Sequence, residues 1–135
     1  MAYALLYRST STYPISTLGM QALSARSAQR NREVGITGLL LHGMHTQVDG
    51  VPGAFVQWIE GPEEEVRELF RSIEADDRHT SVEVLASGAV EDLAGTDRLF
   101  PDWGMRTEAI SDLPATVEGF LSHVRRQRPR WARAA

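Results

Sequence analysis

The sequence predicts an α+β domain in which helices pack against a single antiparallel or mixed sheet. Short apolar segments of strand length alternate along the chain with segments in which apolar residues recur every three or four positions. The chain has 135 residues, of which 42% are hydrophobic and 24% are charged. These values are typical of one globular domain that can bury its own core.

The N-terminal part is expected to be strand, helix, strand. The first strand is predicted at residues 3–7 and is broken by the polar stretch 9–14, which ends in a proline. A helix capped near Ser16 then runs to about Asn31, because small apolar residues recur at helical spacing. The second strand is predicted at residues 36–41.

The middle of the chain predicts a hairpin followed by a helix. Residues 54–59 are expected to pair with the second strand across a long turn, 42–53, that is rich in Gly, Asp and Pro. Gly61-Pro62-Glu63 is suited to the start of a helix, since Pro and Glu are favoured in the first turn. An apolar stripe at i, i+3, i+4 and i+7 supports that helix: Val66, Leu69, Phe70 and Ile73.

The C-terminal part predicts two further strands and a helix. A half-buried strand is expected at residues 82–85, a loop at 91–102, and an edge strand running through Met105. A terminal helix, ended by Pro129, is indicated by a last apolar stripe: Val117, Phe120, Leu121 and Val124. The order β-α-β-β-α-β-β, with two helices on one face of the sheet, is the ferredoxin-like pattern.

Charge and composition exclude several classes of protein. The net charge is −4, yet five of the 14 cationic residues, all of them Arg, follow the last acidic residue, Glu118, so that the body without them carries −9. Nucleic-acid binding by such a body is not expected. The absence of Cys excludes disulfides and thiolate metal sites, and no segment reaches the length of a membrane span. We expect a cytoplasmic protein that neither spans nor binds a membrane.

Five short motifs occur in a fixed order. They are Tyr7-Arg8-Ser9, Arg30-Asn31 six residues before Thr37-Gly38, Phe55-Val56-Gln57-Trp58-Ile59-Glu60-Gly61, Asp77-Arg78-His79, and Phe100-Pro101-Asp102-Trp103-Gly104-Met105. No single motif is specific. Together, over about residues 3 to 105, they resemble the BLUF family of blue-light sensors that use FAD.

The resemblance implies a flavin that lies between the first two helices with its ring facing the sheet. Tyr7 and Gln57 would be the photochemical pair, and Asn31 would hydrogen-bond the polar edge of the ring. Trp103 and Met105 would be the switch residues that exchange places near Gln57. The cofactor implied is FAD, with FMN or riboflavin as alternatives.

Three further residues complete the implied binding site: Arg30 would lie over the ring, and Arg78 and His79 would lie near the ribityl or phosphate end. On this interpretation residues 1–109 form the photosensor domain, and residues 110–135 form a helical extension with a basic tail. The signal would pass to a separate, unidentified partner protein, and the terminal helix would cover the sheet or mediate homo-oligomerisation.

The proposed chemistry suits these two residue types. A phenol with an ordinary pKa of about 10 is neutral at physiological pH and carries both an electron and a proton to donate. A glutamine amide has an acceptor oxygen and a two-donor nitrogen, so rotation or tautomerisation reverses the hydrogen bonds that it offers. Glutamate could not act as a neutral switch of this kind.

Three of these candidate site residues also have a purely structural interpretation. Tyr7 alone is typical of a core aromatic residue, Gln57 could face solvent on an alternating strand, and Asn31 could be a helix C-cap. His42, His45 and Asp49 are a weak candidate for a metal site.

Two rival functions stay open from the sequence. The first is a flavin-free ferredoxin-like interaction module, and the second is a small acylphosphatase-like or flavin-dependent enzyme. An enzyme is not expected, because the sequence shows no nucleophile–base pair and no Gly-rich phosphate loop.

Overall fold

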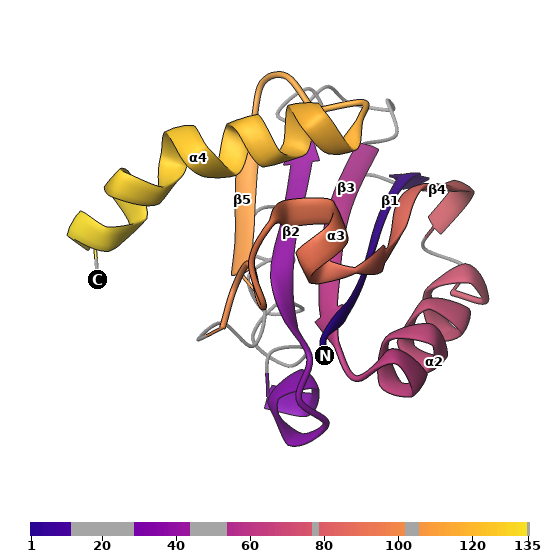
Figure 1. Ribbon diagram of the computed structural model, residues 1–135. Helices are drawn as coiled ribbons and strands as arrows, with labels where there is room; N and C mark the ends of the chain where they lie inside the picture. The colour runs from indigo at the N-terminus through magenta and orange to yellow at the C-terminus, as the bar shows by residue number, and fades with distance from the viewer. Residues whose placement is uncertain (12–28, 44–53, 77–78, 102–105, 135) are drawn as a thin grey trace.

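The computed structural model describes residues 1–11, 29–43, 54–76, 79–101 and 106–134. They contain a five-stranded sheet with the order β4-β1-β3-β2-β5 (Figure 1). Its strands are β1 (Tyr3–Ser11), β2 (Thr37–Gly43), β3 (Ala54–Gly61), β4 (His79–Ala89) and β5 (Arg106–Ile110). Neighbouring strands are antiparallel except β5, which is parallel to β2. The predicted α+β class with a mixed sheet is therefore confirmed.

Helices cover both faces of this sheet. Helix α2 (Glu63–Glu74) packs on one face, and α3 (Val90–Ala94) and α4 (Val117–Ala134) pack on the other (Figure 1). The cluster on the α2 side contains Leu5, Tyr7, Ile36, Ile59, Val66 and Phe70. The larger cluster on the α4 side contains Leu6, Leu39, Leu41, Val56, Trp58, Val90, Phe100, Phe120, Val124 and Trp131 among others.

Strand β3 lies at the centre of the sheet and is buried on both faces. Because successive side chains of a strand point to opposite faces, Gln57 and Ile59 lie on the α2 side, whereas Val56, Trp58 and Glu60 lie on the α4 side. Every residue of β3 after Ala54 is buried. The solvent-facing alternative for Gln57 is therefore wrong, because α2 covers the face on which it lies.

Several predicted elements were too short. Strand β1 continues through Ser11 instead of breaking at Ser9, since it pairs with β3 on one edge and with β4 on the other. Strand β4 covers 11 residues and includes the predicted 82–85. The first helix was predicted to end near Asn31, and its described part, residues 29–33, ends two residues later. Its earlier residues lie outside the described ranges.

Helix α3 lies in a segment that was predicted to be a loop. It has five residues, which is too short to show helical periodicity in the sequence. Val90 is fully buried at its start, and Gly95 adopts a left-handed conformation (φ 73°) at its end, donating its N–H to the Glu91 carbonyl. Burial of Val90 and this C-terminal glycine stabilise the short helix.

Helix α4 continues through Pro129, so the prediction that this proline ends the helix is wrong. A proline inside a helix costs about 3 kcal/mol, because a backbone hydrogen bond is lost and the ring contacts the preceding turn. Packing beyond the proline compensates, since Trp131 is buried against Phe100 and donates its indole N–H to Glu108 at 2.9 Å. The last turns of α4 run in a different direction from its first turns (Figure 1).

No helix in the described parts of the chain is both long and apolar enough to cross a bilayer.

The close approach of β2 to β3 requires a glycine at position 38. A Cβ on Gly38 would lie 2.0 Å from the carbonyl oxygen of Trp58, which is backbone of a central strand and has no space to move. We expect Gly38→Ala to lower the free energy of unfolding by about 2–3 kcal/mol, measured by urea denaturation. Gly43→Ala in the same strand is the control, because its Cβ would lie 3.5 Å from the Leu113 side chain, an ordinary contact. Equal stability of the two variants would contradict this account.

Candidate functional site

The two residues predicted to form the photochemical pair lie side by side on the face covered by α2. Tyr7 of β1 and Gln57 of β3 are direct partners in the antiparallel register. Both are buried, with 1% and 8% of their surface exposed. Since partners in a register project from the same face, two polar side chains meet here within an otherwise apolar layer.

A hydrogen bond joins this pair. The Tyr7 hydroxyl donates to the side-chain oxygen Oε1 of Gln57. In this arrangement the amide of Gln57 accepts from Tyr7 through its oxygen and presents its N–H₂ donors elsewhere in the site. Both groups are thereby oriented by their strands, which are paired over eight positions.

The surroundings of Tyr7 keep its phenol neutral. The ring of Phe70 from α2 lies 5.5 Å from the Tyr7 ring, centroid to centroid, and is tilted by 52°. Burial raises the pKa of Tyr7 well above its ordinary value, and the negative charge of Asp76 raises it further. The O–H proton is therefore retained at any physiological pH and is available for transfer.

Asn31 is a buried polar residue just before the second strand. Only 3% of its surface is exposed, and its carbonyl accepts hydrogen bonds from the N–H groups of Val34 (3.1 Å) and Ile36 (2.8 Å). Ile36 packs in the cluster on the α2 side, so the turn carries the chain toward the face that holds Tyr7. The helix runs on to residue 33, so Asn31 lies inside its last turn and the C-cap interpretation of Asn31 is wrong.

The comparisons with known proteins agree with this geometry. A family model described as BLUF, sensors of blue-light using FAD, matches residues 2–106. The chain belongs to this family. A BLUF domain is a flavin-binding sensor of blue light and not an enzyme, in agreement with the sequence-based prediction.

Relatives and solved structures of BLUF proteins are similar over most of this chain. It is 34% identical over 112 residues to the photoactivated adenylate cyclase subunit beta of Euglena gracilis, a match that covers 83% of this chain but only 12% of that protein. The dark-state structure of the BLUF protein BlrB has a TM-score of 0.65 at 36% identity, covering 80% of this chain and 72% of that one. BlrP1 of Klebsiella pneumoniae has a TM-score of 0.68 at 29% identity, covering 93% and 28%.

The α2 side of the sheet fits the flavin that the family uses. A flavin ring is a flat, largely apolar plate with hydrogen-bonding groups along one edge. The face described here offers apolar side chains and the buried amide of Gln57, and the buried amide of Asn31 lies at the end of the first helix; an amide both donates and accepts. Such a donor set matches the polar edge of the ring.

The other predicted BLUF site residues are only partly described. Arg30 is exposed at the end of the first helix. Arg78, Trp103 and Met105 lie outside the described residues. The backbone of His79 begins β4 and pairs with Ser11, but its side chain is not described. The roles of these five residues stay predictions.

The metal hypothesis also stays open. His42 is buried in β2, and burial lowers its pKa below the ordinary value. His45 and Asp49 fall outside the ranges that the structure describes. Within those ranges no group of three His, Asp or Glu side chains is placed to hold a metal ion.

The structure adds two residues that sequence reasoning missed. Asp76 follows α2 and acts on Tyr7 through its charge, a relation that no sequence spacing indicates. Thr107 of β5 lies in the same row as Tyr7 and Gln57, with Leu40 of β2 between them. Its hydroxyl is the one buried side-chain polar atom without a hydrogen-bond partner among the described residues, so it lies where a ligand or a rearranged side chain would gain a contact.

The raised pKa of Tyr7 predicts how stability depends on pH. Above pH of about 10, Tyr7 ionises in the unfolded chain but stays protonated in the folded one, so the unfolded state binds fewer protons and stability falls as pH rises. Compared with Tyr7→Phe, the wild type should lose about 1.4 kcal/mol of unfolding free energy more per pH unit above pH ~10. Urea denaturation at a series of pH values measures both; parallel curves would contradict burial of a neutral phenol.

Proposed function

We propose that this BLUF domain binds FAD between α2 and the first helix and signals through Tyr7 and Gln57. The observation that carries the proposal is the buried hydrogen bond from the Tyr7 hydroxyl to Gln57 on the two adjacent central strands. When bound, FAD would absorb blue light and, once excited, accept an electron. Asn31 would hold the polar edge of the ring, and Arg30, Arg78 and His79 would hold the rest of the cofactor.

Tyr7 is suited to the role of electron and proton donor. Its raised pKa means that the phenol is neutral before the reaction. Loss of an electron makes a phenol O–H strongly acidic, so its proton leaves along the hydrogen bond to Gln57. The amide oxygen of Gln57 accepts this proton or passes it on, and the phenol recovers both particles when the dark state returns.

Gln57 is suited to convert this transfer into a lasting change of hydrogen bonding. Its oxygen accepts from Tyr7 in the described state, and reversal of the amide by rotation or tautomerisation would turn an N–H toward Tyr7 instead. The oxygen would then face the flavin carbonyl, and as the O–H of the imidic acid tautomer it would donate a hydrogen bond there, which shifts absorption to the red. Each such bond is worth about 1 kcal/mol, which is enough to move a neighbouring side chain.

We also propose that the signal passes to a separate partner. The cyclase subunit of Euglena gracilis is much longer than this chain, and its name joins light activation to an enzyme activity. That name supports the view that a domain of this kind regulates an effector outside itself. Homo-oligomerisation through α4 and a cytoplasmic location stay part of the proposal.

An absorption spectrum tests the proposed function most directly. The purified protein, as obtained or after reconstitution with FAD, should show flavin bands that shift to the red under blue light and return in darkness. Chromatography of the released cofactor distinguishes FAD from FMN and riboflavin. A protein that stays colourless after reconstitution would instead favour the flavin-free interaction module.

Removal of either member of the pair should abolish the light response. Tyr7→Phe removes the O–H, and Gln57→Leu removes both amide atoms at similar volume. We expect each variant to bind flavin but to show no light-induced red shift in a light-minus-dark difference spectrum. Stability should fall by about 1–3 kcal/mol in Gln57→Leu, because the buried Tyr7 hydroxyl loses its acceptor.

Two matched controls make the same chemical changes elsewhere. Tyr3→Phe alters the same strand, at a tyrosine that lies under the Arg67 guanidinium, and Gln127→Leu alters a half-buried residue of α4. Both should keep the full red shift. A normal shift in Tyr7→Phe or Gln57→Leu would contradict the assigned role of that residue.

A further inference from the structure

Glu60 is a fully buried carboxylate on the strand that carries Gln57. It lies three residues after Gln57 on β3, on the opposite face of the sheet, and none of its surface is exposed. A carboxylate in such a place is very costly unless its oxygens accept several hydrogen bonds. The sequence motif included Glu60 but indicated no role for it.

Five donors surround the two carboxylate oxygens of Glu60. Oε1 accepts from the Trp58 indole N–H (2.8 Å) and the Leu99 backbone N–H (2.8 Å). Oε2 accepts from Phe100 N–H (3.1 Å), Arg98 Nε (3.1 Å) and the Thr37 hydroxyl (3.4 Å). We call Thr37, Trp58, Glu60 and Arg98, with the backbone of Leu99 and Phe100, the Glu60 cluster.

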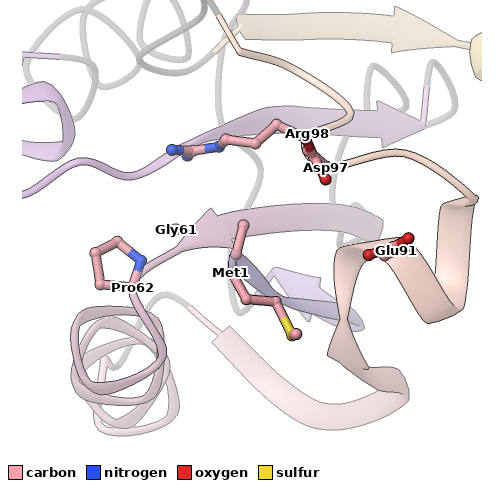
Figure 2. A pocket seen from close by; sticks show the side chains of 7 residues that line it. Met1, Gly61, Pro62, Glu91, Asp97 and Arg98 are labelled. Atoms are coloured by element: carbon pink, nitrogen blue, oxygen red, sulfur yellow. The ribbon is translucent and has the colours of Figure 1, made fainter.

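Arg98 extends this cluster to the turn before β2 and to the backbone of β3. Besides its contact with Glu60, its Nη2 atom donates to the carbonyl oxygens of Gly35 (3.0 Å) and Glu60 (3.0 Å) and to the Thr37 hydroxyl (2.9 Å). The side chain of Arg98 is 29% exposed at the edge of an open cleft of about 610 Å³, where Figure 2 shows it extending from beside Asp97 toward the Gly61–Pro62 side. The Arg98 side chain therefore joins the 98–100 segment to β3 through an ion pair and to β2 through a hydrogen bond.

The segment held in this way leads into the predicted switch residues. Phe100 is 1% exposed and packs against the rings of Phe120 and Trp131 of α4, at centroid distances of 6.5 and 6.4 Å. Six residues after Phe100 the chain enters β5, whose first residue, Arg106, is in register with Leu39. Both ends of the 101–105 connection, which contains Trp103 and Met105, are thus fixed to the sheet.

We propose that Glu60 is a positioning residue of the photosensor. It fixes the start of the connection that carries Trp103 and Met105 to the strand that carries Gln57, and this attachment sets the rate at which the light-adapted state returns to darkness. The inference rests on the proposed function. Glu60 does not contact the site directly, because Tyr7 and Gln57 lie on the other face of β3.

Glu60→Gln tests this role with the smallest chemical change. The variant keeps the size of the side chain, but it removes the charge that pairs with Arg98 and turns one acceptor into a donor facing other donors. We expect normal flavin content and a red shift of wild-type size, but a dark recovery faster by about fivefold or more, since the loosened connection returns more readily. Recovery is followed by absorption after a blue-light pulse, well below the melting temperature of each variant.

Glu63→Gln is the matched control. Glu63 pairs with Arg67 at 2.8 Å on the exposed surface of α2, so the same substitution there should leave the recovery rate unchanged. Arg98→Lys is the second variant, for the case that Glu60→Gln does not fold: it keeps a cation beside Glu60 but loses the planar fork, and it should also accelerate recovery.

The outcomes separate this inference from the proposed function. A wild type without a red shift would overturn both. A wild type that cycles normally, with recovery in the folded variants within about twofold of it, would overturn the role of Glu60 alone. Loss of flavin and of the red shift in proportion to a lowered melting temperature would show a purely structural role and would also overturn it.

Discussion

Burial of both faces of β3 is the constraint on which the rest of the structure depends. A central strand covered on both sides can hold a polar side chain only where the opposite layer or a neighbouring strand provides partners, since an unsatisfied buried group costs about 1–3 kcal/mol. Gln57 meets this requirement through Tyr7 of β1. Glu60 meets it through five donors from β2, β3 and the 98–100 segment. The polar groups of β3 therefore specify which elements must lie on each face.

Helix α4 contributes buried side chains to the same hydrophobic core as β3. Phe120 stacks on Trp58 at 5.6 Å with an interplanar angle of 5°. Glu108 of β5 accepts from Trp131 Nε1 and lies 2.9 Å from His123 Nε2, while Arg128 donates to the Leu99 carbonyl at 2.6 Å. The helix thus contacts the chain on both sides of the 101–105 connection, so a change in that connection has a direct route to α4. The boundary predicted at residues 109 and 110 stays a prediction.

The features that follow from local pattern were predictable, and those that depend on distant partners were not. The α2 stripe predicted a helix whose Val66 and Phe70 are buried. The meeting of Tyr7 and Gln57, 50 residues apart, was implied only by the resemblance to the BLUF family. Periodicity could not indicate α3, because five residues do not complete two turns. Pro129 predicts a helix end because a proline removes a backbone hydrogen bond of the helix. The contacts of Trp131 that compensate for this loss come from residues 23 and 31 positions earlier in the chain.

The two polar residues of β3 differ in a way that suits them to different tasks. The amide of Gln57 is neutral and carries a donor and an acceptor on one planar group. It can therefore adopt two arrangements that exchange donor for acceptor without moving a net charge. An ionised Glu60 carboxylate is an acceptor only, and its donors on Trp58, Leu99, Phe100 and Arg98 leave it no second arrangement. Gln57, on one face of β3, can therefore exchange donor for acceptor, whereas Glu60, three residues later on the other face, has a single hydrogen-bonding arrangement. Because β3 is buried and paired with a strand on each edge, the proposed reversal at Gln57 would be taken up by the side chains packed beside it rather than by movement of the strand.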